Sequence, residues 1–579
     1  MGEIQRVMTA SAATPRMGMI GSVGTQAGRL LAAAALATNV ASSTGSLAAD
    51  AKLDMISGAG NDTILADGGE GYYGDNDIVA GDALATGEDG TATASNSASV
   101  NVTTEEDANG SYFWADAGND VIDGGEGGNI LAGDAATTDD DGGDATANNL
   151  AEVDGAEGRA NAGSDFITAE YGTNFVAGDA LTWGEETTAQ ANNTAEADGA
   201  EGFAGAGNDE IELYDTSYDK VAGDALTYGG GSLAETNNSA TAAGMSTEAK
   251  AGNDYIDLND AYASAVAGES LATGYGSSAD VENTSTASGY GSAYAGSDQI
   301  DTGYGSDTVS GGALAYGDDS EAVITNAATA SDFSAAVAGS DDIDTGNGDD
   351  KVAGDALADG FDSTATSNNE ATSYGNGYAE AGGDYIDPGA GNDLVSGDAM
   401  TIGEDSGEAT ANNTATVNGA GVAEAGSDVI QDYYGDDTIA GDALTVADHV
   451  DARADNDAIV TTEGGYAYAG DDVIYSGYGG DPETYKVAGE SVTLGDYAQA
   501  VAENGTHGAG SSAGNDYILA GDSAGEGEYV DDCWVPAAQI AGESLALGDY
   551  GEAHATNMVY GDDVNNDGDE RAGNDTITA

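Results

Sequence analysis

The clearest pattern along the chain is an alternation of small apolar and polar residues that recurs about every 44 residues. One copy reads Ala-Thr-Ala-Asn-Asn-Thr-Ala-Thr-Val at residues 409–417. A period of two is typical of a β-strand with one buried face, because successive side chains point to opposite sides of the strand. We call this pattern segment C and predict a strand at each copy, with its alanine side buried.

Two further segments repeat with the same spacing. Segment A reads Ala-Gly-(Asn/Ser)-Asp-x-Ile in most of its twelve copies, with interior intervals of 43–45 residues and outermost intervals of 58 and 59. Segment B usually follows 15 or 16 residues later and reads Val-Ala-Gly-Asp-Ala-Leu. Three copies of segment B carry Glu at the acidic position, and one carries Gly312. Short aliphatic runs bounded by glycine predict strands here as well.

Segment C also places an asparagine on its inward face in every copy. These C-asparagines are Asn96, Asn149, Asn193, Asn238, Asn283, Asn326, Asn369, Asn413, Asn456, Asn504 and Asn557. If equivalent strands stack, the amides form a column in which each can donate to the next, which satisfies a buried polar side chain.

Three strands per repeat, joined by Gly/Asp-rich turns, predict an all-β fold: a parallel β-solenoid or β-roll of about 11–12 repeats of about 44 residues with three short strands per repeat. We expect one repeat per coil and a rise of about 4.8 Å per coil; two turns per repeat is the alternative. Residues 53–579 form the predicted solenoid, and residues 1–52 form a separate N-terminal segment.

Charge narrows the functional classes. The chain has 105 Asp and Glu against 11 Lys and Arg, a formal charge of −94, which argues against nucleic acid as a partner. One cysteine excludes a disulfide framework, and no run of 18 apolar residues is present to span a bilayer. Phenylalanine and tryptophan number only 6 and 3, so we expect a thin interior built mainly from small residues.

Glycine and aspartate spacing points to a metal. Segment A contains Gly-x-Gly-x-Asp-x-Ile, as at residues 58–64, and several repeats carry a second aspartate nine residues on, as in the pair Asp298 and Asp307. Over roughly half of each repeat, the chain resembles the RTX, or haemolysin-type, calcium-binding nonapeptide repeat family. The resemblance implies that glycines form the turn, that the aspartate binds Ca²⁺ between stacked turns, and that the following aliphatic residue points inward.

The residues themselves favour the same ion. Carboxylate and turn carbonyl oxygens are hard donors that suit Ca²⁺ better than softer metals. Stacked carboxylates about 5 Å apart also repel by about 3 kcal/mol at an effective dielectric of 20, and multiple Ca²⁺ ions would offset that repulsion. The predicted ligands in segment A and its nine-residue copies are Asp62, Asp120, Asp165, Asp209, Asp254, Asp298, Asp307, Asp341, Asp350, Asp384, Asp393, Asp428, Asp437, Asp472, Asp516 and Asp575. The predicted ligands in segment B are Asp82, Asp134, Asp179, Asp224, Asp355, Asp398 and Asp442.

Some repeats depart from the nine-residue pattern. Asn129 and Asn174 replace the second aspartate, and the repeats at Asp209 and Asp254 lack the nine-residue step. A separate stretch with Asp563, Asn565 and Asp567 begins like an EF-hand loop but lacks the closing glutamate, and we include it as a candidate calcium site.

Catalytic motifs carry little weight in this chain. The sequence at 510–514 matches Gly-x-Ser-x-Gly, and that at 69–74 matches Gly-x-Gly-x-x-Gly. Neither lies in a predicted strand–turn–helix unit, and 91 glycines make chance matches expected. We therefore expect no enzyme activity.

The two ends of the chain look complementary. Residues 33–41 have the spacing of segment C, residues 20–22 resemble a degraded segment B, and the last motif is a lone segment A. A head-to-tail contact between copies could then complete a coil and generate a fibre; the alternative is that residues 1–50 cap the first coil.

Together these features predict a secreted, extracellular or cell-surface structural protein that binds calcium and self-assembles into a filament, biofilm matrix or surface layer. A cell-surface polysaccharide is a further candidate partner. The alternatives are a calcium-dependent adhesin and an ice-binding solenoid, although the outward threonines of segment C are irregular.

Overall fold

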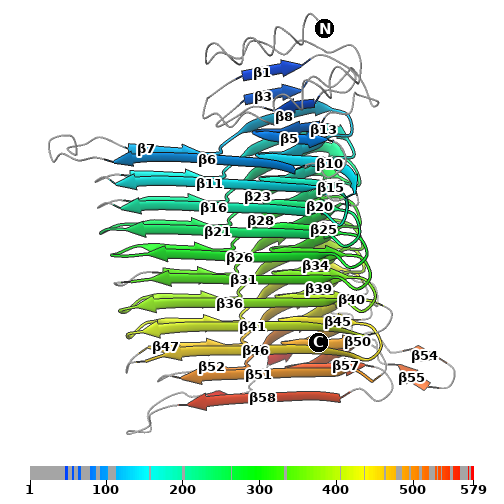
Figure 1. Cartoon of the computed structure of the whole chain (residues 1–579). Helices are drawn as coiled ribbons and strands as arrows, with labels where there is room; N and C mark the ends of the chain where they lie inside the picture. The colour runs from blue at the N-terminus through cyan, green and yellow to red at the C-terminus, as the bar shows by residue number, and fades with distance from the viewer. Residues whose placement is uncertain are drawn as a thin grey trace, which may run out of the picture. The chain divides into compact units, whose positions relative to one another are not determined.

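The computed structural model describes residues 46–578 except 50–54, 58–62, 67–77, 87–90, 102–112, 142, 155–157, 199–201, 263, 332–334, 404–405, 436, 462–464, 477–484, 495–496, 508–511, 521–527, 531–532, 536–537, 548–551, 561–570 and 573–575. Within these residues the protein is all-β, with parallel strands stacked in register (Figure 1). The predicted parallel β-solenoid is confirmed. The chain divides into two compact units, residues 1–285 and 286–579, which we describe one at a time.

Each repeat has five strands rather than the three that the sequence predicted. In one repeat these are β13 (Phe166–Gly172), β14 (Phe175–Ala177), β15 (Ala180–Glu185), β16 (Thr188–Asp198) and β17 (Phe203–Ala206). Segment B contributes two strands because its Gly-Asp step interrupts the ladder between β14 and β15. The fifth strand is only four residues long and directly precedes segment A, so its alternation was too short to recognise.

The register of the paired strands shows how many coils each repeat forms. Every residue of β11 (Asp144–Asp154) pairs with its equivalent in β16, from Asp144 with Thr188 to Asp154 with Asp198. The other four strands of the repeat pair in the same way with their equivalents one repeat along. One repeat therefore forms one coil, as expected, and identical positions form columns along the stack.

In the first unit, equivalent strands form five sheets, numbered here in chain order from segment A. Sheet 1 contains β1 (Ser46–Ala49), β3 (Thr63–Ala66), β8 (Val121–Glu126), β13, β18 (Glu210–Thr216) and β23 (Tyr255–Ala261). Sheet 2 contains β2 (Met55–Ser57), β4 (Ile78–Ala80), β9 (Ile130–Ala132), β14, β19 (Lys220–Ala222) and β24 (Ala265–Ala267). Sheet 3 contains β5 (Ala83–Thr86), β10 (Ala135–Asp141), β15, β20 (Ala225–Tyr228) and β25 (Ser270–Thr273). Sheet 4 contains the long segment C strands β6 (Thr91–Asn101), β11, β16 and β21 (Leu233–Ala243), with β26 (Ser278–Ala287) at the unit boundary. Sheet 5 contains β7 (Phe113–Ala117), β12 (Gly158–Ala162), β17 and β22 (Glu248–Ala251).

The second unit repeats the five sheets. Sheet 1 contains β28 (Gln299–Gly303), β33 (Asp342–Asp344), β38 (Tyr385–Ala390), β43 (Val429–Tyr434), β48 (Val473–Ser476), β53 (Tyr517–Ala520) and β60 (Thr576–Thr578). Sheet 2 contains β29 (Thr308–Ser310), β34 (Lys351–Ala353), β39 (Leu394–Ser396), β44 (Thr438–Ala440), β49 (Tyr485–Ala488) and β56 (Ala538–Ala541). Sheet 3 contains β30 (Ala313–Tyr316), β35 (Ala356–Asp359), β40 (Ala399–Ile402), β45 (Ala443–Val446), β50 (Ser491–Leu494) and β57 (Ser544–Leu547). Sheet 4 contains β31 (Glu321–Ala330), β36 (Thr364–Tyr374), β41 (Gly407–Asn418), β46 (Val450–Val460), β51 (Gln499–His507) and β58 (Glu552–Tyr560). Sheet 5 contains β27 (Ser292–Ala295), β32 (Ala335–Ala338), β37 (Tyr378–Ala381), β42 (Val422–Ala425), β47 (Tyr466–Ala469), β52 (Ser512–Ala513) and β59 (Arg571–Ala572). An antiparallel hairpin, β54 (Glu528–Val530) with β55 (Cys533–Val535), is inserted before β56.

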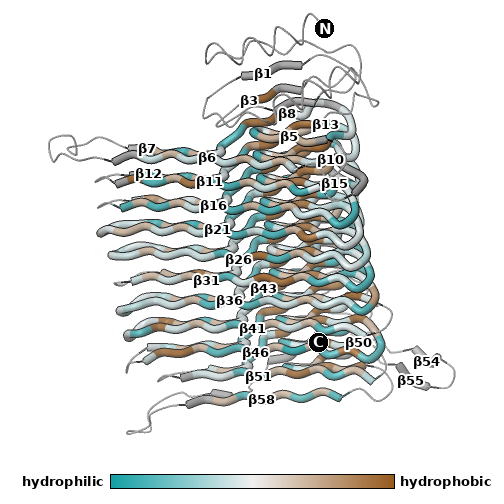
Figure 2. Tube along the Cα trace, viewed as in Figure 1, coloured by the Kyte–Doolittle hydropathy of each residue, from teal (hydrophilic) through white to brown (hydrophobic). Residues whose placement is uncertain are grey.

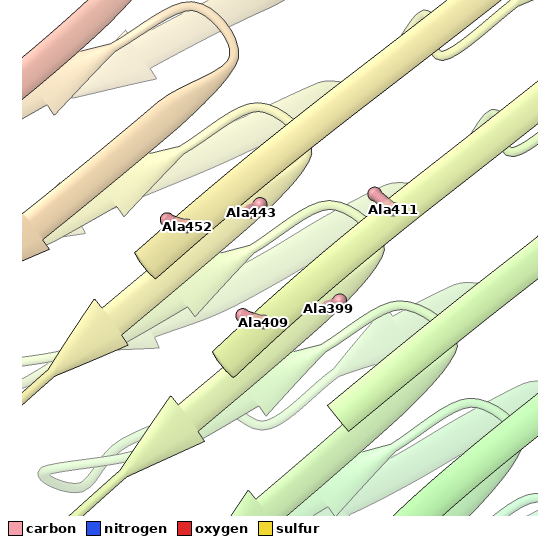
Figure 3. Close-up of a cluster of buried hydrophobic side chains, with 5 residues drawn as sticks. All are labelled: Ala399, Ala409, Ala411, Ala443 and Ala452. Carbon is pink, nitrogen blue, oxygen red and sulfur yellow. The ribbon is translucent and has the colours of Figure 1, made fainter. Parts of the chain in front are cut away.

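Two kinds of packing fill the coils. Sheets 1 to 3 contribute columns of buried Ile, Val and Leu, exemplified by Ile167, Val176 and Leu181, which appear as brown segments over the short strands in Figure 2. Sheets 4 and 5 lie against each other with alanine between them, as in the contact of β11 with β12. A similar alanine cluster lies between sheets 3 and 4, where β40 and β45 pack against β41 and β46 (Figure 3), with Ala399, Ala409, Ala411, Ala443 and Ala452 together. The thin interior predicted from composition is therefore present.

The N-terminal strands lie partly within the segment that the sequence set apart. β1 pairs with β3, so residues 46–49 join the first sheet of the solenoid. The segment B-like and segment C-like stretches at 20–22 and 33–41 lie outside the described residues. Among the described residues, no helix is long and apolar enough to cross a membrane.

Candidate metal centre

The C-asparagines form the amide column that the alternation predicted. Asn149 Nδ2 donates to Asn193 Oδ1 at 3.0 Å, and Asn193 Nδ2 donates to Asn238 Oδ1 at 3.0 Å. The second unit repeats the pattern, with Asn369 donating to Asn413 at 3.0 Å. An amide has both a donor and an acceptor, so each asparagine satisfies its neighbours and the column is stable without charge.

The same amides donate to the acids of segment B, which we call the B-acids. Asn193 Nδ2 lies 2.5 Å from Asp179 Oδ2 in its own coil and 3.3 Å from Asp224 Oδ1 in the next. In the second unit, Asn413 Nδ2 lies 2.9 Å from Asp398 Oδ2. The B-acids are therefore buried beside the asparagines, a contact that the sequence analysis did not predict.

The aspartates of segment A, which we call the A-aspartates, form a second buried column. One carboxylate oxygen of each accepts a hydrogen bond from the backbone of its equivalent in the preceding coil, as in Asp165 N to Asp209 Oδ1 at 2.5 Å and Asp341 N to Asp384 Oδ1 at 2.6 Å. The other oxygen, Oδ2, is buried and has no hydrogen-bond partner among the described residues at Asp165, Asp209, Asp384, Asp428 and Asp472. Each of these carboxylates thus has one oxygen fixed by the backbone and one left to a ligand or a proton.

The glycine of segment B makes room for that second oxygen. A Cβ atom on Gly178 would lie 1.7 Å from Asp209 Oδ2 and 1.9 Å from the Gly223 carbonyl oxygen, so no larger residue fits. The same relation holds at Gly397, where a Cβ atom would lie 1.8 Å from Asp428 Oδ2. The glycine of segment B therefore has a backbone carbonyl oxygen and a carboxylate oxygen close beside it, and both are ligands that hard cations prefer.

At several of these junctions, one A-aspartate meets the B-acids of two successive coils. In each group, one carboxylate oxygen per residue lies within 4.8 Å of the others, and all three residues are buried. Such triads include Asp82–Asp120–Asp134, Asp134–Asp165–Asp179, Asp179–Asp209–Asp224 and Asp355–Asp384–Asp398. The structure thus brings together the ligands predicted in segments A and B, which the sequence alone could not pair.

Burial and mutual repulsion make these carboxylates hard to ionise. Burial raises the pKa of Asp165 well above its usual range, and the neighbouring carboxylates of Asp209 and Asp120 raise it further. Burial likewise raises the pKa of Asp442 to about 6. The same direction and leading cause apply to Asp134, Asp209, Asp384, Asp398, Asp428, Asp472 and Glu490. At neutral pH the column must therefore hold protons or a compensating cation.

The second aspartates of the nine-residue step form a further column near sheet 2, which we call the second-turn column. Asp307 N donates to Asp350 Oδ1 at 2.8 Å, and Asp350 N donates to Asp393 Oδ1 at 2.8 Å. Burial raises the pKa of Asp350 to about 7 and that of Asp393 to about 8. These residues therefore stack on one another in the described coils.

Two acids in this region were missed from the sequence. Asp219 follows Asp209 by ten residues rather than nine, yet it occupies the second-turn column, where Asn174 N donates to its Oδ1 at 2.7 Å. Asp432 is buried and shares a carboxylate cluster with Asp393 and Asp437. The signal for Asp219 was its place directly before the Lys-Val-Ala strand of segment B, which a fixed nine-residue step ignores.

One coil lacks a B-acid because Gly312 takes that position. A Cβ atom on Gly312 would lie 1.9 Å from Ile324 Cδ1, so the isoleucine fills the space of the missing side chain. Ile324 is in register with Ser367 of the next coil, which donates to Asp355 Oδ2 at 2.9 Å. The series of B-acids is thus interrupted at this coil by the apolar contact of Ile324 with Gly312.

Several predicted positions lie outside the described residues: Asp62, Asp575, Asp563, Asn565, Asp567 and the glycine motif at 69–74. Of the Gly-x-Ser-x-Gly motif, residues 510 and 511 also lie outside them, and Ser512 begins the short strand β52.

Comparisons with known proteins give no name to this arrangement. No family model, no curated protein and no solved structure matches the chain.

Proposed function

We propose that the protein is a secreted structural solenoid in which bound Ca²⁺ stabilises the stack of coils. The observation that carries this proposal is the repeating triad, in which an A-aspartate and two B-acids from successive coils are buried with their oxygens within 4.8 Å of one another. Three carboxylates in a buried site strongly attract a hard cation. An ion placed there would join neighbouring coils directly.

Composition supports a cation rather than an internal counter-charge. The chain has 11 Lys and Arg for 105 acids, so few basic side chains could pair with the buried carboxylates. Because charges in a buried cluster repel strongly, the stack gains more from each bound ion than an exposed acidic surface would. Calcium fits better than Mg²⁺, since irregular sets of carboxylate and carbonyl oxygens suit its flexible coordination.

Self-assembly and location complete the proposal. A stack of parallel strands presents a backbone edge at each end, and such edges template pairing with another copy. The resemblance to the RTX repeat favours an extracellular setting, where calcium is abundant. We therefore propose a head-to-tail filament that contributes to a biofilm matrix or surface layer, without enzyme activity.

A second candidate function, that of an adhesin, is favoured by an aromatic cluster in the first unit. Trp183 stacks on Tyr228 with ring centroids 4.4 Å apart, and Phe175 meets Trp183 edge-on at 4.6 Å. Partly exposed stacked rings are suited to the apolar faces of sugar units, so a cell-surface polysaccharide is the partner that this cluster would take.

Calcium titration of the metal-free full chain tests the main proposal. We expect β-structure, followed by far-UV circular dichroism, to appear with Ca²⁺ at concentrations where Mg²⁺ is ineffective, and filaments to appear in electron micrographs only afterwards. Sodium chloride at equal ionic strength controls for simple screening. A protein that is fully folded in metal-free buffer at neutral pH would show that protons alone satisfy the triads, and folded protein without filaments would remove the assembly part.

A further inference from the structure

In two coils of the second-turn column, a threonine hydroxyl donates a hydrogen bond to the aspartate. Thr302 Oγ1 donates to Asp307 Oδ2 at 3.1 Å, and Thr345 Oγ1 donates to Asp350 Oδ2 at 2.9 Å. The Asp350 carboxylate is therefore satisfied on both oxygens, because Asp307 N also donates to Asp350 Oδ1. At both positions the threonine hydroxyl satisfies the carboxylate oxygen, so no bound cation is needed there.

The next two coils lose that donor. Pro388 stands at the position of Thr345 relative to the second-turn aspartate and has no hydroxyl group. Asp432 stands at the same place relative to Asp437 one coil further, where a register shift pairs its backbone with Gly389. As a result, Asp393 Oδ2 is buried without a hydrogen-bond partner among the described residues. Asp393 Oδ1, by contrast, keeps the backbone hydrogen bond from Asp350 at 2.8 Å.

We propose that Asp393, Asp432 and Asp437 form a single cation site that binds Ca²⁺ more tightly than the triads do. One oxygen from each lies within 4.8 Å of the others, and the three residues are 0%, 1% and 0% exposed. They come from three elements: Asp432 lies in β43, while Asp393 and Asp437 precede β39 and β44.

The chemistry of the site differs from that of the triads. In the triads, asparagine amides donate to the B-acids and so weaken them as ligands, as Asn413 does to Asp398 at 2.9 Å. In this cluster the position that donates a hydroxyl in neighbouring coils carries a third carboxylate instead. Both sites have three carboxylates, but Asp393 Oδ2 accepts no hydrogen bond among the described residues, whereas the B-acids of a triad accept from asparagine. The oxygens of this site are therefore more available to the ion at equal charge.

The turn beside the cluster brings a backbone carbonyl oxygen close to Asp437, where it could serve as a further ligand. A Cβ atom on Gly435 would lie 2.2 Å from Asp437 Oδ1 and 1.5 Å from the Gly391 carbonyl oxygen, so only glycine fits there. Three carboxylates and a nearby carbonyl oxygen offer up to about seven oxygens, within the six to eight that Ca²⁺ takes.

The inference rests on the proposed binding of hard cations, but its test is separate. The calcium-loaded full chain is dialysed against a calcium chelator buffer of falling free Ca²⁺, and the ion retained per chain is measured. We expect the wild type to retain one ion after the triads have emptied. Asp432→Asn and Asp432→Thr should lose that ion, with an affinity lower by about tenfold or more, while Glu370→Gln, which removes an exposed charge from β36, should keep it.

Asp432→Thr introduces the residue found at this position two and three coils earlier, Thr345 and Thr302, so it is expected to fold in saturating Ca²⁺, which circular dichroism checks. If the Asp432 variants retain as much calcium as the wild type at every free concentration, the inference fails while the triads stand. If the wild type itself binds no calcium, the proposed function fails as well.

Discussion

The two buried polar columns of this protein differ in how they are satisfied. Along the asparagine column, each amide both donates and accepts, as where Asn369 donates to Asn413 at 3.0 Å. Along the A-aspartate column, each carboxylate can only accept, and the Oδ2 atoms of Asp384 and Asp428 have no hydrogen-bond partner among the described residues. The two columns run through the same coils and are equally buried.

The difference shows why one column can be neutral and the other must depend on its surroundings. A stacked amide repeats indefinitely without gathering charge, whereas each added carboxylate repels the previous one. The amide-to-amide contacts of the asparagine column therefore contribute stability without bringing charges together. The acid column contributes stability only when protons or cations neutralise it.

The largest expected effect is the pH dependence of the metal-free protein. Because burial raises the folded-state pKa of Asp442 to about 6, of Asp350 to about 7 and of Asp393 to about 8, these groups stabilise the fold when protonated. Their contribution is complete below about pH 4, the unfolded pKa, and is lost as pH rises through the folded values, by about 1.4 kcal/mol per group and pH unit.

Urea titrations between pH 4 and pH 8 in metal-free buffer should therefore show a falling midpoint. In saturating Ca²⁺ the slope should reverse, because protons then compete with the bound ion. A metal-free midpoint that is constant over this range would contradict the burial of ionisable carboxylates among the B-acids and in the second-turn column.

The next effect comes from converting one rung of the amide column into an acid. Asn413→Asp would replace the donor that reaches Asp398 at 2.9 Å and Asn456 at 3.0 Å with a carboxylate. We expect a loss of about 3 kcal/mol or more of unfolding free energy at neutral pH, since the new buried charge faces other acceptors. Chemical denaturation measures the loss.

Asn412→Asp provides the matched control, because Asn412 lies next to Asn413 but on the outer face of β41, where its burial is only partial. Its effect should stay within about 0.5–1 kcal/mol. Equal losses for the two variants would mean that the inner column has no special role.

The effect of the converse substitution on the free energy of unfolding should change sign when calcium is added. Asp384→Asn keeps the shape of an A-aspartate whose pKa burial raises well above its usual range, and it gives the junction a donor for Asp355 and Asp398. We expect a gain of about 1–3 kcal/mol in metal-free buffer and a loss in saturating Ca²⁺. Asp342→Asn, which removes an exposed acid from β33 of the preceding coil, should change neither value; a gain in both buffers would show that no cation binds at this junction.

The smallest effect is expected at the coil where Gly312 interrupts the series of B-acids. Gly312→Asp combined with Ile324→Ser would restore the composition of the next coil, where Asn369 donates to Asp355 Oδ2 at 2.7 Å. With calcium present we expect a change of about 1 kcal/mol or less and additional bound calcium, measured by atomic absorption. Ile324→Ser alone should be more destabilising because it leaves a cavity beside Gly312. An unchanged calcium content would show that a B-acid is not a ligand.

Much of the fold could be predicted because it depends on short-range periodicity. The alternation around Asn413 identified the buried face of segment C, and the near-constant intervals identified the stacking of like on like. The number of strands was underestimated because the four-residue strand β17 is shorter than any reliable alternation, and because the glycine of segment B divides one apolar run into two strands.

The candidate site was predicted residue by residue but not as an assembly. Segment spacing nominated Asp134, Asp165 and Asp179, yet only the structure shows that they meet. Asp219 escaped notice because one extra residue in the turn hides it from a fixed spacing. Asp432 escaped because its significance lies in the threonine that stands at its position two coils earlier, Thr345.

The sequence by itself determined the repeat, the parallel stacking and the inward asparagines, since these depend on side-chain alternation and on equal spacing along one chain. The tertiary structure decided which acids share a junction, which oxygens remain without a donor and where the column is interrupted. These properties depend on contacts between successive coils, about 30–45 residues apart in the chain, and burial at such contacts sets whether a carboxylate is a solvated charge or a site that requires a proton or a cation.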